Sequence, residues 1–308
     1  SPDNLNYLWV QLDQNVRAKD SDSYKISTGS MQRKLDFTWI KPGYVIGDKE
    51  ANEILNKFDG GFNIEEVVTI DGRKLNYVIN KTMMRIDLIK PMKPGSKMSI
   101  SIRWNYNIQD RIFMGGRPGY EFFKSDSNYL YTICQWFPRM AMYNDVYGWQ
   151  NKQFLGRGEF TLDFGDYDVR ITVPSDHIVA ATGELQNSME VLTSAQIKRL
   201  KQARASDEPV IIITQGEAEK NEKSRSKKFK TWRYKAKNVR DFAFTSSRKF
   251  IWDAMGIRLG SRTIMAMSYY PKEANPLYER YSTKAVAHTL RVYSKYTFDY
   301  PYPVAISV

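Results

Sequence analysis

The residue types best suited to metal or nucleophilic chemistry are scarce in this chain. It contains two histidines, His177 and His288, and one cysteine, Cys134. The histidines lie too far apart in the sequence to form a His-x-x-x-His zinc pair on one helix. No C-x-x-C pair, P-loop or G-x-S-x-G elbow is present either. We therefore expect no catalytic and no metal-binding residue in this chain, and interpret both histidines as structural and Cys134 as a small buried hydrophobe.

Carboxylates are more numerous, but the sequence does not single out a catalytic pair among them. Asp166 and Asp168 flank Tyr167 in a predicted turn. That arrangement is commonly solvated, and a calcium site at this turn is the alternative.

The chain is basic, with a formal net charge of +12 over 308 residues. Basic residues are dense between Lys220 and Arg240, where Phe229, Trp232 and Tyr234 interleave with them. Cations and aromatic rings together could bind single-stranded nucleic acid. The two-residue alternation of Trp232 and Tyr234 favours another interpretation, a lysine-rich loop over about 220–230 followed by a strand whose aromatic residues face the core. We therefore predict no nucleic-acid partner.

The first half of the sequence predicts a β-rich region. Strands are expected over residues 5–12, 35–40, 64–70, 75–79, 84–89 and 97–106. Asp71-Gly72 predicts a hairpin between the third and fourth of these strands. A further strand pair, 158–164 and 168–173, is expected to meet across Gly165-Asp166. Residues 111–128 predict a long loop or hairpin.

The second half of the sequence mixes helices and strands. The segment 193–206 has helical spacing, with Thr193 or Ser194 as the N-cap. Strands are expected over 209–214 and 262–269, and a long helix over 275–297. The apolar positions of that helix are predicted to be Tyr278, Tyr281, Ala285, Thr289, Val292 and Tyr296. No run of 18 apolar residues occurs, so we predict no transmembrane segment.

Several segments resemble one known family. CQWFPRMAMYNDVYGW places Gln135 just before an F-P sequence, and the motifs VAATGEL, TWRYKAKNVRDFAFTSSRKFIWD and YPYPVAISV follow. This order resembles the N-terminal domain and the start of the catalytic domain of the aminopeptidase N family of zinc metallopeptidases, the gluzincin aminopeptidases of bacterial type. The resemblance covers nearly the whole chain.

The resemblance implies a mainly β fold. Residues 1–252 would form an N-terminal β-saddle or sandwich domain that lacks its first strands. Residues 253–308 would form the truncated start, a strand plus a helix, of a thermolysin-like α/β catalytic domain. Family members continue with a Gly-x-Met-Glu loop and the H-E-x-x-H zinc motif, so we expect this chain to be an internal fragment.

The resemblance also implies a function. The parent protein would be a zinc-dependent aminopeptidase that acts on peptides, and this chain would form the wall of its cleft. By match of motif, Gln135 would bind the free α-amine of the substrate. Zinc is expected in the parent enzyme and none in this chain, which we expect to be inactive without the remainder of the catalytic domain.

Two questions stay open from the sequence. The rival function is a non-catalytic β-sandwich module that binds glycan or protein through Trp136, Tyr143, Tyr147 and Trp149. A basic nucleic-acid binder is the third reading. The compartment is also open, and a periplasmic, secreted or membrane-anchored location outside the cytoplasm is preferred to a cytoplasmic one.

Overall fold

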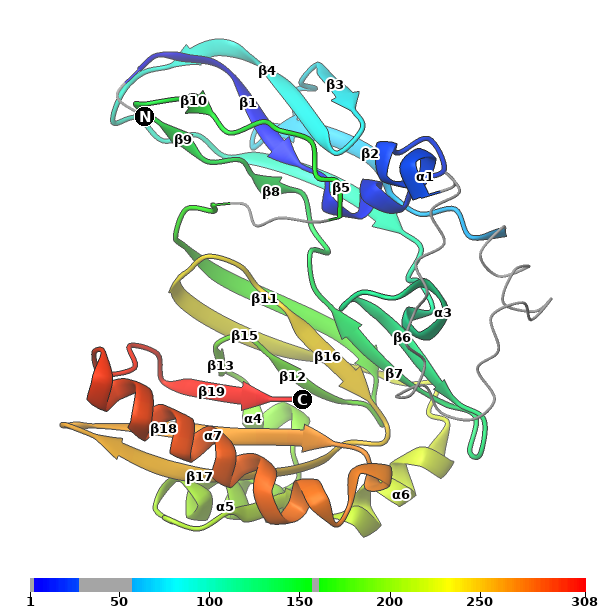
Figure 1. Ribbon diagram of the computed structural model, residues 1–308, viewed down its shortest axis with the longest axis vertical. Coiled ribbons are helices and arrows are strands. Elements are labelled where there is room, and N and C mark those ends of the chain that lie inside the picture. The colour runs from blue at the N-terminus through cyan, green and yellow to red at the C-terminus, as the bar shows by residue number, and fades with distance from the viewer. Residues whose placement is uncertain (1–2, 28–56, 157–160) are drawn as a thin grey trace. The chain divides into compact units, whose positions relative to one another are not determined.

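The computed structural model describes residues 3–27, 57–156 and 161–308 (Figure 1). Most of their regular structure is β, in several separate sheets, so the predicted mainly β class is confirmed. The strand expected over 35–40 lies outside the described residues.

The chain divides into two compact units, and each is built from two segments. Unit 1 comprises Ser1–Gly119 and Gln135–Asp163, and unit 2 comprises Tyr120–Cys134 and Phe164–Val308. The predicted domain boundary at 252/253 falls inside a strand of unit 2 and stays a prediction.

Unit 1 contains a four-stranded sheet in the order β3-β4-β1-β8, the pair β2-β5 and the hairpin β9-β10. Its elements are β1 (Leu5–Gln11), η1 (Asp13–Arg17), α1 (Asp22–Ser27), β2 (Phe62–Thr69), β3 (Tyr77–Asn80), β4 (Met83–Met92), β5 (Ile100–Tyr106), α3 (Arg111–Met114), β8 (Arg139–Met140), β9 (Tyr143–Asn144) and β10 (Gly148–Trp149). Apolar side chains from these strands, such as Val10, Phe62 and Ile86, share one buried cluster. The alternating pattern of the sequence therefore places one face of each long strand in a common core.

The hairpin predicted at Asp71-Gly72 is present over a short stretch. The Thr69 N–H donates to the Arg73 carbonyl (2.9 Å), the Leu75 N–H donates to the Val67 carbonyl (3.0 Å), and Val68 and Lys74 form an antiparallel bridge. The returning chain then leaves β2: β3 pairs with β4, and the long ladder of β2 is with β5.

Unit 2 contains three sheets, in the orders β12-β16-β7-β6, β11-β15-β13 and β14-β17-β18-β19. Its strands are β6 (Gly119–Phe123), β7 (Asn128–Ile133), β11 (Gly165–Pro174), β12 (Ile178–Ala181), β13 (Glu184–Leu185), β14 (Val210–Ile213), β15 (Phe229–Val239), β16 (Phe244–Ser247), β17 (Ile251–Leu259), β18 (Arg262–Tyr270) and β19 (Val304–Ser307). Its helices are α4 (Ser188–Val191), α5 (Ser194–Arg204), α6 (Gln215–Ser224), η2 (Lys272–Ala274) and α7 (Leu277–Tyr296). The hairpin expected over 111–128 is present as β6 and β7, preceded by α3.

Two predictions for unit 2 are corrected by the structure. The strand pair expected across Gly165-Asp166 is wrong, because β11 runs through both residues and pairs along its length with β15. The ladder tolerates Asp166 by a bulge, and its carboxylate accepts a hydrogen bond from the Asn238 N–H (2.8 Å). The lysine-rich loop expected over about 220–230 is wrong in its first part, since α6 extends to Ser224.

Capping explains why the sequence forms α5 and α6. Thr193 and Thr214 each accept a hydrogen bond from the backbone three residues on, and Gln196 and Glu217 return it in two capping boxes. The Thr193 cap was predicted. The Thr214 cap was missed, and with it the helix that follows.

The long helix α7 is confirmed, but its buried face is not the predicted one. Thr283, Ala287 and Leu290 are its buried residues, and the latter two join the core beside β17 and β18. Tyr281, which belongs to the predicted apolar stripe, is 59% exposed. The helix thus carries a second apolar face that the described residues leave in solvent.

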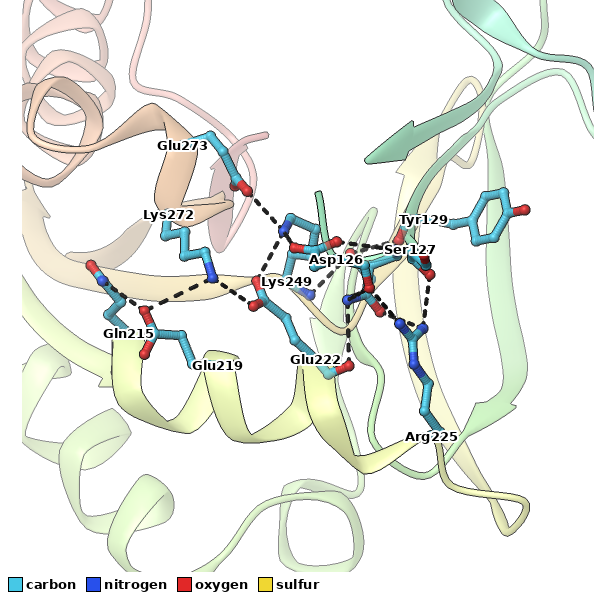
Figure 2. Close-up of polar contacts among 12 residues, drawn as sticks. Asp126, Ser127, Tyr129, Gln215, Glu219, Glu222, Arg225, Lys249, Lys272 and Glu273 are labelled. Atoms are coloured by element: carbon cyan, nitrogen blue, oxygen red, sulfur yellow. Dashed lines mark hydrogen bonds and ion pairs between the residues drawn. The ribbon is translucent and has the colours of Figure 1, made fainter. Parts of the chain in front are cut away.

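A charged cluster lies at one end of unit 2 (Figure 2). The Lys249 side chain is fully buried and forms ion pairs with Asp126, Glu222 at 3.0 Å and Glu273 at 2.8 Å. Lys272 adds a second cation, 2.7 Å from Glu222. The cluster joins the β6–β7 turn, α6, the start of β17 and η2.

Electrostatics in this cluster favours the charged forms. Burial acts to lower the pKa of Lys249, but its hydrogen bonds and ion pairs with the three carboxylates raise that pKa overall. Burial acts to raise the pKa of Asp126, and Lys249 outweighs it, so that pKa lies below its ordinary value. The stabilisation from Asp126 is therefore present near neutral pH and is lost as the pH falls through its lowered pKa.

We expect Lys249→Met to destabilise the protein by about 3 kcal/mol near neutral pH, because it leaves three carboxylates without their shared cation. The measurement is urea unfolding. Acidification through the lowered pKa of Asp126 should narrow the difference from the unsubstituted protein, because that carboxyl group is then protonated and no longer pairs with Lys249.

The matched control is Lys272→Met, whose side chain is 32% exposed. This substitution should lower the free energy of unfolding by at most about 1 kcal/mol, because ion pairs that are partly exposed to solvent contribute little to stability. If the two variants lost the same free energy of unfolding, burial would not increase the contribution of Lys249 to stability.

Candidate functional site

A cavity of about 1530 Å³ lies within unit 2. Its walls come from the ends of β12, β15 and β16, from the turn at 182–183, and from the segment 298–308 that carries β19. We call this cavity the β15–β19 groove. In Figure 1 β19 ends near the labels of β12 and β13.

One wall of the groove is formed by β19. Among the described residues β19 is the outermost strand of its sheet, and it runs parallel to β18. The Met265 N–H donates to the Pro303 carbonyl over 2.9 Å, which sets the register. Because alternate residues of a strand bond to opposite sides, the backbone groups of Val304 and Ile306 point away from β18.

The opposite wall is basic. Lys235, Lys237 and Arg240 line the groove, and Glu184 is the one acidic residue among its lining residues. Lys235 lies 3.7 Å from Asp168, and the Arg240 guanidinium lies over the Phe164 ring. The groove can therefore accept an anionic, extended ligand.

Gly183 closes the turn between β12 and β13 in the groove wall. Its φ is +87°, and a Cβ at this position would lie 2.2 Å from the Lys235 carbonyl oxygen. Only glycine fits such an approach, so this residue sets how closely the turn lies against β15.

The predicted anchor residue, Gln135, lies in unit 1, at the start of a tightly held segment. Its backbone has a φ of +53°, and its carbonyl accepts a hydrogen bond from the Gln14 amide at 3.0 Å. The next carbonyl, of Trp136, accepts from the Trp104 indole N–H at 3.0 Å. Non-glycine residues seldom adopt positive φ, so these bonds help to hold a conformation that the isolated chain would avoid.

A buried ion pair holds the same segment at its other end. The Arg139 guanidinium donates to both oxygens of Asp13, each at 2.9 Å, and both side chains are buried. A bidentate pair of this kind fixes orientation as well as distance. The side chain of Gln135 itself is half-buried.

The described residues do not form a metal site. No group of three or more His, Cys, Asp or Glu side chains comes together among them. His177 is buried, with Nδ1 2.8 Å from the Ser246 hydroxyl, and burial lowers its pKa to about 4. His288 is exposed on α7, and Cys134 is half-buried. These residues do not fit a zinc ion, and no catalytic step through zinc is derived from them.

The remaining candidates from the sequence separate into different surroundings. Asp168 is held by Arg233 through two hydrogen bonds, which with the neighbouring cations keep its pKa at about 2, and Asp166 accepts from the Asn238 N–H; the calcium alternative stays a prediction. Trp232 and Tyr234 are buried, as the core-facing interpretation predicted, so they offer no stacking surface to nucleic acid.

The aromatic platform proposed for a binding module is only partly assembled. The rings of Tyr143 and Trp149 pack edge to face across the β9–β10 hairpin, with their centroids 5.2 Å apart, and Tyr147 is 79% exposed. Trp136 packs against Trp104 in the segment that follows Gln135. That rival function stays a prediction.

Comparison with known proteins gives a structural likeness without a sequence match. No protein-family model and no curated protein sequence matches the chain. The solved structure of the M1 zinc metallopeptidase from Deinococcus radiodurans is similar over 99% of this chain, at 12% identity and a TM-score of 0.48. A mutant of that enzyme bound to a Tyr-Ser-Ala substrate gives 12% identity and a TM-score of 0.49. A two-domain M1 zinc metallopeptidase bound to L-tryptophan gives the same two values.

The chain spans about half the length of these structures, 48–49% of each. At such values the likeness adds nothing to the argument for function. Among the described helices, none is long and apolar enough to cross a membrane.

We expect Gly183→Ala to destabilise the protein by about 2–4 kcal/mol, because the added methyl group meets the backbone of β15 and strains a positive φ. Chemical unfolding measures the loss. Gly216→Ala is the control: nothing lies within 4 Å of its Cβ position in α6, so it should be neutral or slightly stabilising. A neutral Gly183→Ala would mean that the turn moves freely away from β15.

Proposed function

We propose that this chain is part of a zinc-dependent aminopeptidase, in which it forms a wall of the peptide-binding cleft. The sequence motifs around Gln135, Gly183 and Tyr300 support this proposal. The β15–β19 groove supports it as well, because an unpaired strand edge binds extended peptides through main-chain hydrogen bonds. The zinc ligands would come from residues outside the described segments.

In this proposal Gln135 binds the α-ammonium group of the substrate. An ammonium group donates hydrogen bonds, and a carboxamide oxygen is a directional acceptor that carries no charge. The observation that carries the proposal is the fixed backbone of Gln135, held at positive φ by Gln14 and followed by the Trp104 and Arg139 contacts. A fixed backbone restricts where the Gln135 side chain can reach and so lowers the entropy lost on binding, which is what an anchor requires.

We expect Gln135→Ala in the full-length enzyme to lower kcat/KM for amino-acid anilides by about 10- to 100-fold, the worth of a hydrogen bond to a charged group. The control is Gln202→Ala, which removes an exposed carboxamide from α5 and should leave kcat/KM unchanged. N-acetylated substrates provide the second control, because they lack the ammonium group. Unchanged kinetics for Gln135→Ala would refute the anchor.

The partner implied for unit 2 is the remainder of the catalytic domain. An apolar cavity of about 580 Å³ lies along the second face of α7, between that helix and the segment 298–307. Tyr293 and Phe298, 66% and 71% exposed, line this cavity, and Tyr296, 76% exposed, lies one turn away from Tyr293 on α7. Exposed aromatic residues in such number mark a surface that another protein segment covers, and we propose that the catalytic domain does so.

We expect the 308-residue chain by itself to associate reversibly in sedimentation velocity, because this apolar face is open. Tyr293→Ser combined with Tyr296→Ser should shift it toward monomer. Tyr147→Ser, an equally exposed tyrosine in unit 1, should not. A chain that is monomeric at all concentrations would contradict the proposed partner surface.

A further inference from the structure

The basic wall of the β15–β19 groove has a regular spacing. Lys235 and Lys237 are two residues apart on β15, both exposed, with the buried Ala236 between them. Side chains two apart on a strand share a face, at a separation of about 6.6–6.8 Å. An extended peptide repeats its side chains with the same spacing, so alternate residues of such a ligand match the two ammonium groups.

The basic residues that line the groove outnumber its acidic residues. Arg240 adds a third cation, and Glu184 is the one acid that lines the cavity. Asp168, near Lys235, is already bound by two hydrogen bonds to Arg233. Among the described residues, Lys237 has no ion-pair partner within 4.0 Å, and so its charge is available to a ligand.

The backbone of β19 can form main-chain hydrogen bonds with such a ligand. Ile306 presents its N–H and carbonyl, and Val304 its N–H, to the side of β19 away from β18, whereas the Val304 carbonyl already accepts a hydrogen bond from the Tyr300 hydroxyl (3.1 Å). Strand addition at this edge would give affinity through the main chain, and the cations would select the side chains.

We propose that the β15–β19 groove binds extended peptides with acidic residues at alternate positions, whose carboxylates pair with Lys235 and Lys237. This inference rests on the proposed function, since it specifies the peptides that the cleft takes. A polyanionic nucleic acid is the less favoured ligand, because Trp232 and Tyr234 are buried and unable to stack on bases, and the exposed Phe229 does not line the groove.

The test uses the 308-residue chain and peptides blocked at both ends, so that Gln135 has no α-amine to bind. Isothermal titration calorimetry compares acetyl-Glu-Val-Glu-Val-Glu-amide with the peptides in which Gln or Lys replaces every Glu. A fourth peptide of the same composition has its glutamates adjacent. We expect the alternating Glu peptide to bind about tenfold more tightly than the Gln peptide and than the adjacent-Glu peptide, and the Lys peptide to bind more weakly still.

Two double variants test whether the peptide carboxylates pair with Lys235 and Lys237. Lys235→Gln with Lys237→Gln should weaken the alternating Glu peptide about fivefold, since each exposed ion pair contributes modestly. Lys227→Gln with Lys228→Gln removes the same charge from exposed positions that do not line the groove and should change nothing. Raising the salt concentration should weaken the Glu peptide and leave the Gln peptide unaffected.

Three results would overturn the inference: equal binding of the Glu and Gln peptides, equal loss in both double variants, or no binding of any blocked peptide. Tighter binding of an oligonucleotide that competes with the Glu peptide would also overturn it, in favour of nucleic acid. The proposed function is judged separately by the Gln135→Ala kinetics, so the two ideas can fail independently.

Discussion

The alternation of side chains along β15 is the constraint on which most of unit 2 depends. Trp232, Tyr234 and Ala236 point inward and are buried, and removal of an aromatic ring from such a position costs about 3–5 kcal/mol. The Tyr234 hydroxyl donates to the Val179 carbonyl (2.8 Å) and so connects the β11-β15-β13 sheet to β12. The same register forces Lys235 and Lys237 outward. The core and the charge of the groove are therefore set by one strand and cannot be altered separately.

The functional proposals divide between the two units in a way that reflects how each holds its residues. In unit 1 the Gln135 segment has little regular structure, and side-chain hydrogen bonds from η1 and β5 hold its backbone. In unit 2 the groove is formed by regular strands, and its shape comes from sheet geometry and from one glycine turn. Anchoring of a single group suits the first arrangement, and recognition of an extended ligand suits the second.

Local patterns predicted the elements well where a short segment contains its own signal. The α5 cap at Thr193, the alternation of β15 and the length of α7 could all be read from consecutive residues. Pairing partners could not be read in this way: the long ladder of β2 is with β5, which lies beyond β3 and β4 in the chain. The α7 stripe was assigned to the wrong face because the helix has two apolar faces, and periodicity does not say which one meets a sheet. Gln135 was found through family motifs, but its positive φ has no signal in the sequence. The basic wall was visible as Lys235 and Lys237, whereas the open edge of β19 opposite them appears only in three dimensions.

The Lys249 cluster has a consequence for how fast the protein unfolds. Asp126 and Lys249 are separated by 123 positions in the sequence, and Lys272 and Glu222 by 50. Lys249 gains its full set of counterions only after the longest of these loops has closed, so we expect the complete cluster to form late on the folding pathway. Interactions that form after the transition state slow unfolding and leave the folding rate nearly unchanged. We therefore expect the cluster to slow the unfolding of unit 2 more than it speeds its folding, and so to lengthen the lifetime of the folded state.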